Sequence, residues 1–391
     1  MSHLDAHRRR LLALGACWPP SAALAGLASA APARAAPAVP SGPALTLGHS
    51  SPVSGIFASS AAEARAAIDA ALAQTHAEGG IHGRPLQVLT LDDGYDAERA
   101  LANAERLRTQ EGALALIAPV GTATLDALMP WAERTRTPII GPRSGADRQR
   151  EYRRYVFFTS ASFGDEVRHL VRHWSTLGIG RAALAHFDNP AGRDIRDHFQ
   201  AAAQASGLGV AGVLAFAPAG TDSAAVAQRL TQPALAAVPL VLAGGGEGTV
   251  ALLRQLLQHG RAAASIYAMS LLPWSQVQEA LGAVAQGMVF TQVVPSPGQP
   301  RLPLAAQFRQ AMRATPTLAT ATAFERYLGM RLVVHGLRAA GPGADGAALA
   351  EALERAGTID LAGHRLSFDR HSHHGTRFVD LGILGRGRLL Q

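Results

Sequence analysis

The sequence predicts an α/β protein made of two doubly wound, Rossmann-like units, each a parallel sheet with crossover helices. Short apolar runs alternate with helical patterns along most of the chain, and this order is typical of parallel sheets. The alternation occurs in two successive runs. The chain has 391 residues, 48% apolar and 17% charged, which is sufficient for two hydrophobic cores. We therefore expect two lobes.

The first run begins soon after residue 40. Its predicted strands and helices are 44–49, 57–78, 86–91, 96–109, 114–117, 122–135 and 138–140, in that order. Gly79-Gly80 ends the first helix, because glycine readily adopts the left-handed conformation of helix ends. Apolar strands separated by helices predict a complete doubly wound unit.

The second run repeats this pattern. Strands are predicted near 156–159, 182–186, 210–214, 238–242 and 266–269, with helices near 166–177, 194–205, 223–230 and 249–258. The pattern then becomes helical from residue 302 to about 355, and 365–368 and 376–384 predict a terminal hairpin. The chain therefore crosses between the two units more than once.

Residues 1–35 have the pattern of an export signal. Arg8-Arg9-Arg10 precede an Ala/Leu-rich stretch, and Ala33-Arg34-Ala35 forms a small-x-small cleavage site. Arginines 8 and 9, with the two leucines that follow Arg10, also resemble a twin-arginine signal, and the general secretory route is the alternative. We expect a periplasmic protein.

The single cysteine, Cys17, lies inside this signal. The residues before it resemble a lipoprotein box, so lipid anchoring at Cys17 is an alternative to cleavage after Ala35. Beyond the signal there is no thiol for a disulfide, a cysteine nucleophile or a thiolate metal site.

Several classes of chemistry are excluded by composition. All 36 basic residues are arginine, and without lysine a Walker A loop or a Schiff base cannot form. The arginines are scattered rather than clustered with aromatic residues, which argues against nucleic-acid binding despite the net charge of +7. His371, His373 and His374 could share a metal, but a solvated turn explains them better without a partner motif. We expect no cofactor, no metal and no catalytic residue.

Ligands of open α/β sheets bind beyond the carboxyl ends of the strands. Thr122 directly follows the strand predicted at 114–117 and opens a helix. A hydroxyl beside free backbone N–H groups is suited to a carboxylate.

Six segments, taken in order, resemble the type I periplasmic binding proteins of the Leu/Ile/Val-binding class. They are residues 47–55, 78–85, 91–93, 118–122, 138–142 and 287–295. The resemblance implies two lobes joined by three chain crossings. The lobes would close over a small ligand, and an inner-membrane ABC permease would recognise the closed form. The lobes would comprise 44–160 plus 293–356 and 161–292 plus 357–391. We expect a monomer.

The resemblance also implies ligand contacts at Thr122, Ser144, Gly145, Phe163, Asp188, Asn189, Gly246, Glu247 and Ser270. From their positions in the loops near Thr122 we add Ser51, Ser54, Ala123 and Arg143 as candidates, with a solvent-facing side chain as the alternative for Arg143. Ser51 and Ser54 could instead cap the following helix.

The chain departs from amino acid binders at two of these places. Ser270 stands where the family has an acid for the ligand ammonium, and Ala191 replaces an aromatic residue. Glu247 could substitute for the acid, or Arg143 could pair with an anionic group. Amino acids, aromatic acids and small carboxylates therefore all remain candidate ligands.

We expect the binding component of an ABC importer. A ligand-sensing receptor or regulator of the same fold is the alternative, and a gene for a permease or a kinase beside this one would distinguish them. A secreted hydrolase would need a nucleophile and a base, and only the histidine cluster offers a base.

Overall fold

The computed structural model of the protein describes residues 40–317 and 319–390. The predicted signal, with Arg8, Arg9, Arg10, Cys17 and the cleavage site at Ala35, lies outside these residues. Within the described part of the chain, no helix has both the length and the apolar character needed to cross a bilayer.

The first sheet is entirely parallel. Its strands are β1 (Leu45–Ser51), β2 (Leu86–Asp92), β3 (Leu116–Ile117), β4 (Ile139–Ile140) and β5 (Val156–Phe157), in the order β2-β1-β3-β4-β5. The order reverses between β1 and β3, so the loops after these two strands diverge and leave a crevice at their carboxyl ends. A ligand-binding site is therefore expected between these two loops.

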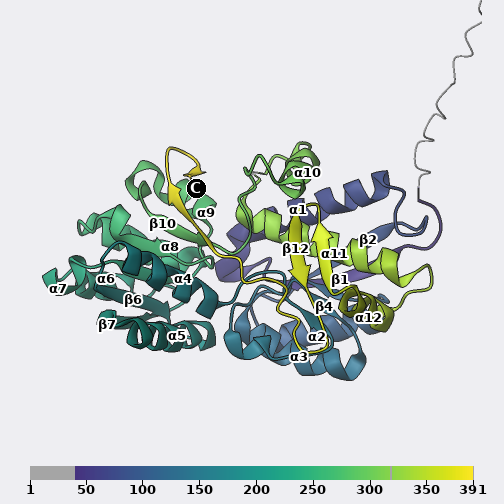
Figure 1. The fold of residues 1–391 in the computed structure, drawn as a ribbon, viewed down its shortest axis with the longest axis horizontal. Helices are drawn as coiled ribbons and strands as arrows, with labels where there is room; N and C mark the ends of the chain where they lie inside the picture. The colour runs from purple at the N-terminus through teal and green to yellow at the C-terminus, as the bar shows by residue number, and fades with distance from the viewer. Residues whose placement is uncertain (1–39, 318, 391) are drawn as a thin grey trace, which may run out of the picture. The chain divides into compact units, whose positions relative to one another are not determined.

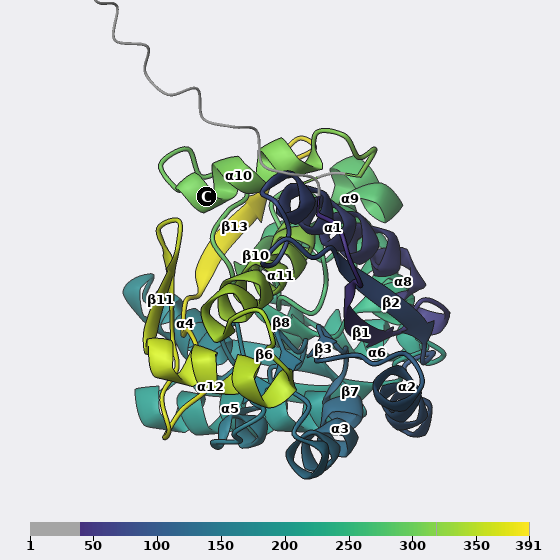
Figure 2. The same cartoon turned by 90° about the vertical axis from the view of Figure 1, so that its right-hand side faces the viewer.

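Six helices and a hairpin surround this sheet. They are α1 (Ala58–Ala77), α2 (Ala97–Thr109), α3 (Thr122–Thr135), α10 (Pro303–Met312), α11 (Ala321–Ala340), α12 (Gly346–Ala356) and the hairpin of β11 (Thr358–Leu361) with β12 (His364–Ser367). Two short 3-10 helices, Gly55–Phe57 and Asp147–Arg150, lie in its loops. Figures 1 and 2 show α11 beside α1, although the two helices are far apart in sequence. We call residues 40–157 and 303–368 the N-half.

The second sheet has seven strands. They are β6 (Arg181–Phe187), β7 (Gly209–Phe216), β8 (Leu240–Ala243), β9 (Ile266–Ala268), β10 (Val289–Gln292), β13 (Asp380–Leu384) and β14 (Leu389–Leu390). The order is β14-β13-β10-β9-β8-β6-β7, and only the pairs of β13 with β10 and with β14 are antiparallel.

Helices cover both faces of this sheet. They are α4 (Phe163–Thr176), α5 (Pro190–Ser206), α6 (Ser223–Leu230), α7 (Pro233–Ala236), α8 (Gly246–Gln258) and α9 (Trp274–Leu281), with 3-10 turns at Ala263–Ser265 and Gly282–Ala285. Separate apolar clusters form on its two faces, one around Phe216 and Phe290, the other around Trp174 and Phe199. We call residues 163–292 and 380–390 the C-half.

Three segments connect the halves, at 158–162, 293–302 and 369–379. The first and third run side by side, because the N–H of Phe158 donates to the carbonyl of His373 and the N–H of Gly375 donates to the carbonyl of Phe158. Figure 1 shows the third segment leaving β12 toward the C-half.

The chain after residue 356 differs from the predicted boundary, which assigned all of 357–391 to the second lobe. Every second residue of the β11–β12 hairpin is buried, and Ile359 and Leu366 pack in the N-half core. The hairpin predicted between 365–368 and 376–384 is also absent, because β12 pairs with β11 through a turn at Ala362-Gly363. Both turn residues have positive φ, as a two-residue hairpin turn requires.

A buried carboxylate ties α4 to the strands β9 and β10. The hydroxyl of Thr291 and both the N–H and the hydroxyl of Ser270 donate to Glu166, the latter two at 2.9 Å. Burial raises the pKa of Glu166, although these donors act in the opposite direction.

Glu166→Gln should change how stability depends on pH. A carboxyl group with a raised folded-state pKa contributes stability that is present below its unfolded pKa and is lost as the pH rises through the folded pKa. The wild type should therefore lose melting temperature relative to Glu166→Gln as the pH rises above about 4.5, measured by calorimetry. The exposed Glu279→Gln serves as control, and a difference that does not change with pH would contradict this account.

Gly192, in the first turn of α5, lies directly against the end of β6. A β-carbon there would lie 1.8 Å from the carbonyl oxygen of Phe187, whereas nothing lies within 4 Å of a β-carbon at Gly180. Gly192→Ala should therefore cost about 1–3 kcal/mol of stability by overpacking, and Gly180→Ala should cost much less. Thermal unfolding of both variants measures this, and equal melting temperatures would refute it.

Candidate ligand-binding site

A cavity of about 40 Å³ lies where loops at the carboxyl ends of the parallel strands of both sheets meet. The N-half contributes Phe57, Ser60, Tyr95, Val120, Gly121, Thr122, Arg143 and Arg326, and the C-half contributes Phe163, Ala191, Gly246, Leu271, Pro273 and Gln276. This volume suits about three water molecules. A ligand as large as an amino acid therefore requires the lining to move apart.

The N-terminus of α3 forms one wall. Thr122 is 3% exposed, and its hydroxyl lies 3.0 Å from the hydroxyl of Ser144. The N-cap, Gly121, has φ 113° and gives no side-chain cap. A β-carbon at Gly121 would lie 2.6 Å from the ring of Tyr95, so only glycine permits this packing. The N-cap therefore leaves the first N–H groups of α3 without a side-chain acceptor, and Gly121 and Thr122 at this helix start line the cavity.

Arg143 links the two halves across the cavity. It follows β4, and its Nε lies 3.5 Å from Oε2 of Glu325 in α11. Its Nη2 donates to the carbonyl of Ser270 in the C-half at 3.1 Å. The side chain is 13% exposed, so both contacts are shielded from water.

Arg326, the next residue in α11, is a buried cation that also lines the cavity. It is 4% exposed, and its Nε and Nη1 have no hydrogen-bond partner among the described residues. Its Nη1 lies 4.0 Å from Oε2 of Glu325, the carboxylate that also faces Arg143. Burial lowers the pKa of Arg326 to about 9, so the group is still charged at neutral pH.

The histidine near Arg326 carries no charge. His49, buried in β1, has its pKa lowered to about 3 by burial and by the charges of Arg326 and Arg65. It is therefore a neutral imidazole at physiological pH.

Aromatic rings form much of the remaining wall. Phe57 and Tyr95 contact edge to face with ring centroids 4.6 Å apart. Phe163 packs on Gly145, where a β-carbon would lie 2.3 Å from the ring. Burial, assisted by Asp93, raises the pKa of Tyr95 to about 12, so its hydroxyl remains a hydrogen-bond donor.

Four of the residues predicted from the sequence line the cavity, and three more contact them. Thr122, Arg143, Phe163 and Gly246 are in the lining. Ser144 and Gly145 support Thr122 and Phe163, as described above. Ser270 uses its carbonyl for Arg143 and its N–H and hydroxyl for Glu166.

The other predicted residues lie outside the lining. Ser51 is buried in β1, the hydroxyl of Ser54 donates to Asp92 at 2.6 Å, and Ala123 is exposed.

In the C-half, Asp188 is 68% exposed and pairs with Arg193, and the side chain of Asn189 caps α5. Glu247 accepts a hydrogen bond from Gln276 at 2.9 Å. These side chains interact with neighbouring residues of the C-half, and neither acid lies in the cavity lining.

Sequence reasoning missed Tyr95 and Arg326. Their burial in one cavity depends on tertiary packing, because Tyr95 follows β2 whereas Arg326 belongs to α11. The signal available for Arg326 was a charged pair, Glu325-Arg326, inside an otherwise apolar helical segment.

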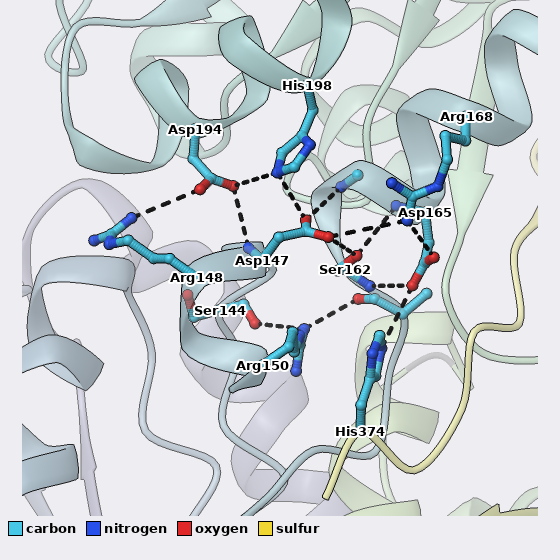
Figure 3. Close-up of polar contacts among 12 residues, drawn as sticks. Ser144, Asp147, Arg148, Arg150, Ser162, Asp165, Arg168, Asp194, His198 and His374 are labelled. Carbon is cyan, nitrogen blue, oxygen red and sulfur yellow. Dashed lines mark hydrogen bonds and ion pairs between the residues drawn. The ribbon is translucent and has the colours of Figure 1, made fainter. Parts of the chain in front are cut away.

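One group in the described residues has donor atoms placed for a metal: Asp147, Asp194 and His198, within 4.8 Å of one another. Figure 3 shows that their oxygens already have partners. Asp147 accepts from the hydroxyl of Ser162 and the N–H of Gly164 at 2.9 and 2.8 Å. His198 Nε2 lies 3.2 Å from Asp147, and the N–H of Asp147 donates to Asp194. These contacts hold the loop before α4 to the start of the C-half.

The histidines singled out from sequence do not form such a group. His373 stacks on Phe157 with centroids 4.0 Å apart. His374 Nε2 lies 3.4 Å from Asp165, as Figure 3 also shows. Together with His371 they give no metal-ligating set in the described part of the chain.

Solved structures with the same fold come from several bacteria. An extracellular ligand-binding receptor from Verminephrobacter eiseniae is 25% identical, with TM-score 0.81 over 89% of this chain and 100% of the other. A "possible leucine/isoleucine/valine-binding protein" from Rhodopirellula baltica is 25% identical, with TM-score 0.80 over 89% and 96%.

A third structure shares the fold at lower identity. It is an ABC transporter solute-binding protein from Rhodopseudomonas palustris in complex with 4-hydroxybenzoate, 18% identical, with TM-score 0.77 over 89% and 95%. No curated protein sequence matches this chain. The family model described as "Periplasmic binding protein" matches residues 44–382. The chain therefore belongs to the periplasmic binding protein family, in its type I, Leu/Ile/Val-binding class.

Proposed function

We propose that this protein is an extracytoplasmic solute-binding protein that captures a small carboxylate-bearing ligand and delivers it to an ABC importer of the inner membrane. The observation that carries the proposal is a cavity shared by both halves, with the N-terminus of α3 and Arg143 in its wall. We take the N-half and C-half as its two lobes and the periplasm as its location, and we expect a monomer.

The chemistry of this wall favours an anion. The first N–H groups of α3 and the hydroxyl of Thr122 can donate to a carboxylate, and the helix dipole adds a partial positive charge. The guanidinium of Arg143 adds a full positive charge, and charge-assisted hydrogen bonds to a carboxylate are among the stronger ones in proteins. Ser144, Gly145, Phe163 and Gly246 would complete the contacts.

The lining supports capture rather than catalysis. It contains hydroxyls from Ser60, Tyr95 and Thr122, but no histidine or carboxylate from the described residues. A hydroxyl nucleophile needs an adjacent base to remove its proton. We therefore propose a binding protein and not an enzyme.

Contacts between the halves indicate how a permease can detect that the ligand has been bound. Arg143 donates to Ser270, the hydroxyl of Ser275 donates to Glu63 at 2.7 Å, and Arg148 Nη1 lies 3.8 Å from Asp194. A ligand that contacts both halves stabilises the arrangement in which these contacts form. A permease would recognise that arrangement.

Ligand binding raises the melting temperature by mass action, so a thermal-shift screen of residues 36–391 against amino acids, aromatic acids and aliphatic acids tests the proposal. At least one carboxylate should stabilise the protein. If only divalent metals do so, the proposal fails and attention moves to Asp147, Asp194 and His198.

Thr122→Ala should weaken binding of the carboxylate found in that screen by about tenfold or more, because one hydrogen bond to a charged group is lost. Thr135→Ala, at the other end of α3, is the matched control and should leave the affinity unchanged. Calorimetric titration measures both. Unchanged affinity in Thr122→Ala would remove this residue from the site.

Delivery is a separate question from capture. Deleting the gene should abolish uptake of the radiolabelled ligand by the source bacterium. If uptake persists while a transcriptional or motile response to the ligand is lost, the protein is a sensor of the same fold.

A further inference from the structure

We infer that the ligand is an organic carboxylate without an ammonium group, and that Arg326 is the residue that selects it. This inference rests on the proposed function of solute capture in the same cavity. It depends on an observation independent of the helix N-terminus: a guanidinium that is buried, lines the cavity and has two N–H-bearing nitrogens without partners among the described residues.

A buried cation without partners is costly. Removing a guanidinium from water forfeits its hydration, and that cost is offset only by well-placed acceptors. Among the described residues, Arg326 has a contact at 4.0 Å to Glu325 and none closer to an acid. A ligand carboxylate entering the cavity would supply two acceptor oxygens, in the planar arrangement that a guanidinium binds well.

The acids around Arg326 do not replace the ligand. Glu325 is shared between Arg143 and Arg326, so one carboxylate faces two guanidinium groups. Glu63 also lies within electrostatic range of Arg326, but its two oxygens accept from Ser275 and Thr320 at 2.7 Å each. Glu63 is therefore held by hydroxyl donors, and Nε and Nη1 of Arg326 keep their hydrogen-bonding capacity for a ligand.

An ammonium group would have no carboxylate partner in the described lining. The described lining contains two arginines and no acid. Glu247, which could have substituted for the acid of amino acid binders, lies outside this lining. Because like charges repel strongly in a site that excludes water, an α-ammonium beside Arg143 and Arg326 would be rejected.

The rest of the lining favours an apolar ligand body. Phe57, Tyr95, Phe163, Leu271 and Pro273 present carbon surface to the cavity. Aromatic walls of this kind contribute through burial and through edge-to-face contacts. We therefore infer an aromatic or branched aliphatic acid with a single carboxylate.

Matched pairs of ligands test the selection directly. 3-Phenylpropanoate and L-phenylalanine differ only in the ammonium group, and so do 4-methylpentanoate and L-leucine. In calorimetric titrations of the wild type, at least one ammonium-free acid should bind at least about 30-fold more tightly than its amino acid partner, the factor expected for one unpaired buried charge.

Variants of Arg326 test its role. Arg326→Met should weaken the better acid at least about 30-fold, because one partner of a buried charge pair is removed, and Arg326→Lys should lie between the two because an ammonium lacks the planar fork. Arg331→Met, on the same helix but paired with Glu78 at 3.2 Å, is the control and should bind normally. Without ligand, Arg326→Met should melt no lower than the wild type, since it removes an unpartnered buried charge.

The outcomes separate this inference from the proposed function. If each amino acid binds as tightly as its ammonium-free partner, or if Arg326→Met keeps full affinity, the inference is overturned while carboxylate capture stands. If Arg326→Met does not fold, two other measurements test the inference. They are the affinity of Arg326→Lys for the better acid and the comparison of each acid with its amino acid. If the wild type binds no carboxylate at all, the proposed function itself fails.

Discussion

Both sheets present the carboxyl ends of their parallel strands to one cavity, and the other features of the site follow from that constraint. In the N-half the strand order reverses between β1 and β3, which opens the crevice beside α3. In the C-half the loops after β8 and β9 bring Gly246 and Leu271 to the same place. A ligand held there must contact both halves, so capture is coupled to the distance between them.

The charges beside this cavity form an arrangement that is unfavourable without a ligand. Glu325 neutralises one of two neighbouring guanidinium groups, and its own environment is buried. Binding sites commonly hold residues that destabilise the free protein and are compensated by the ligand. In this protein the compensation is expected from one carboxylate, with the helix N-terminus and the hydroxyl of Thr122 as additional donors.

Local pattern was sufficient for much of the fold and for part of the site. The apolar strands and the position of Thr122 at a helix start follow from near neighbours in sequence. The family resemblance indicated Phe163 as a candidate, and loop position and charge indicated Arg143. The placement of β11 and β12 in the N-half could not be predicted in this way, because it depends on which half's core buries Ile359 and Leu366. Arg326 was missed for a similar reason: whether a guanidinium in a buried helix has a partner is decided by residues distant in sequence.

The N-half core has a consequence for how the protein is made. It combines β1, near residue 45, with Phe368, so its members span almost the whole chain. The core cannot be completed before residue 368 has been synthesised, nor the sheet containing β13 before residue 384. Such long-range contacts slow folding and leave apolar strands exposed meanwhile. A chain that has not yet reached β13 therefore exposes apolar strands that the folded protein buries.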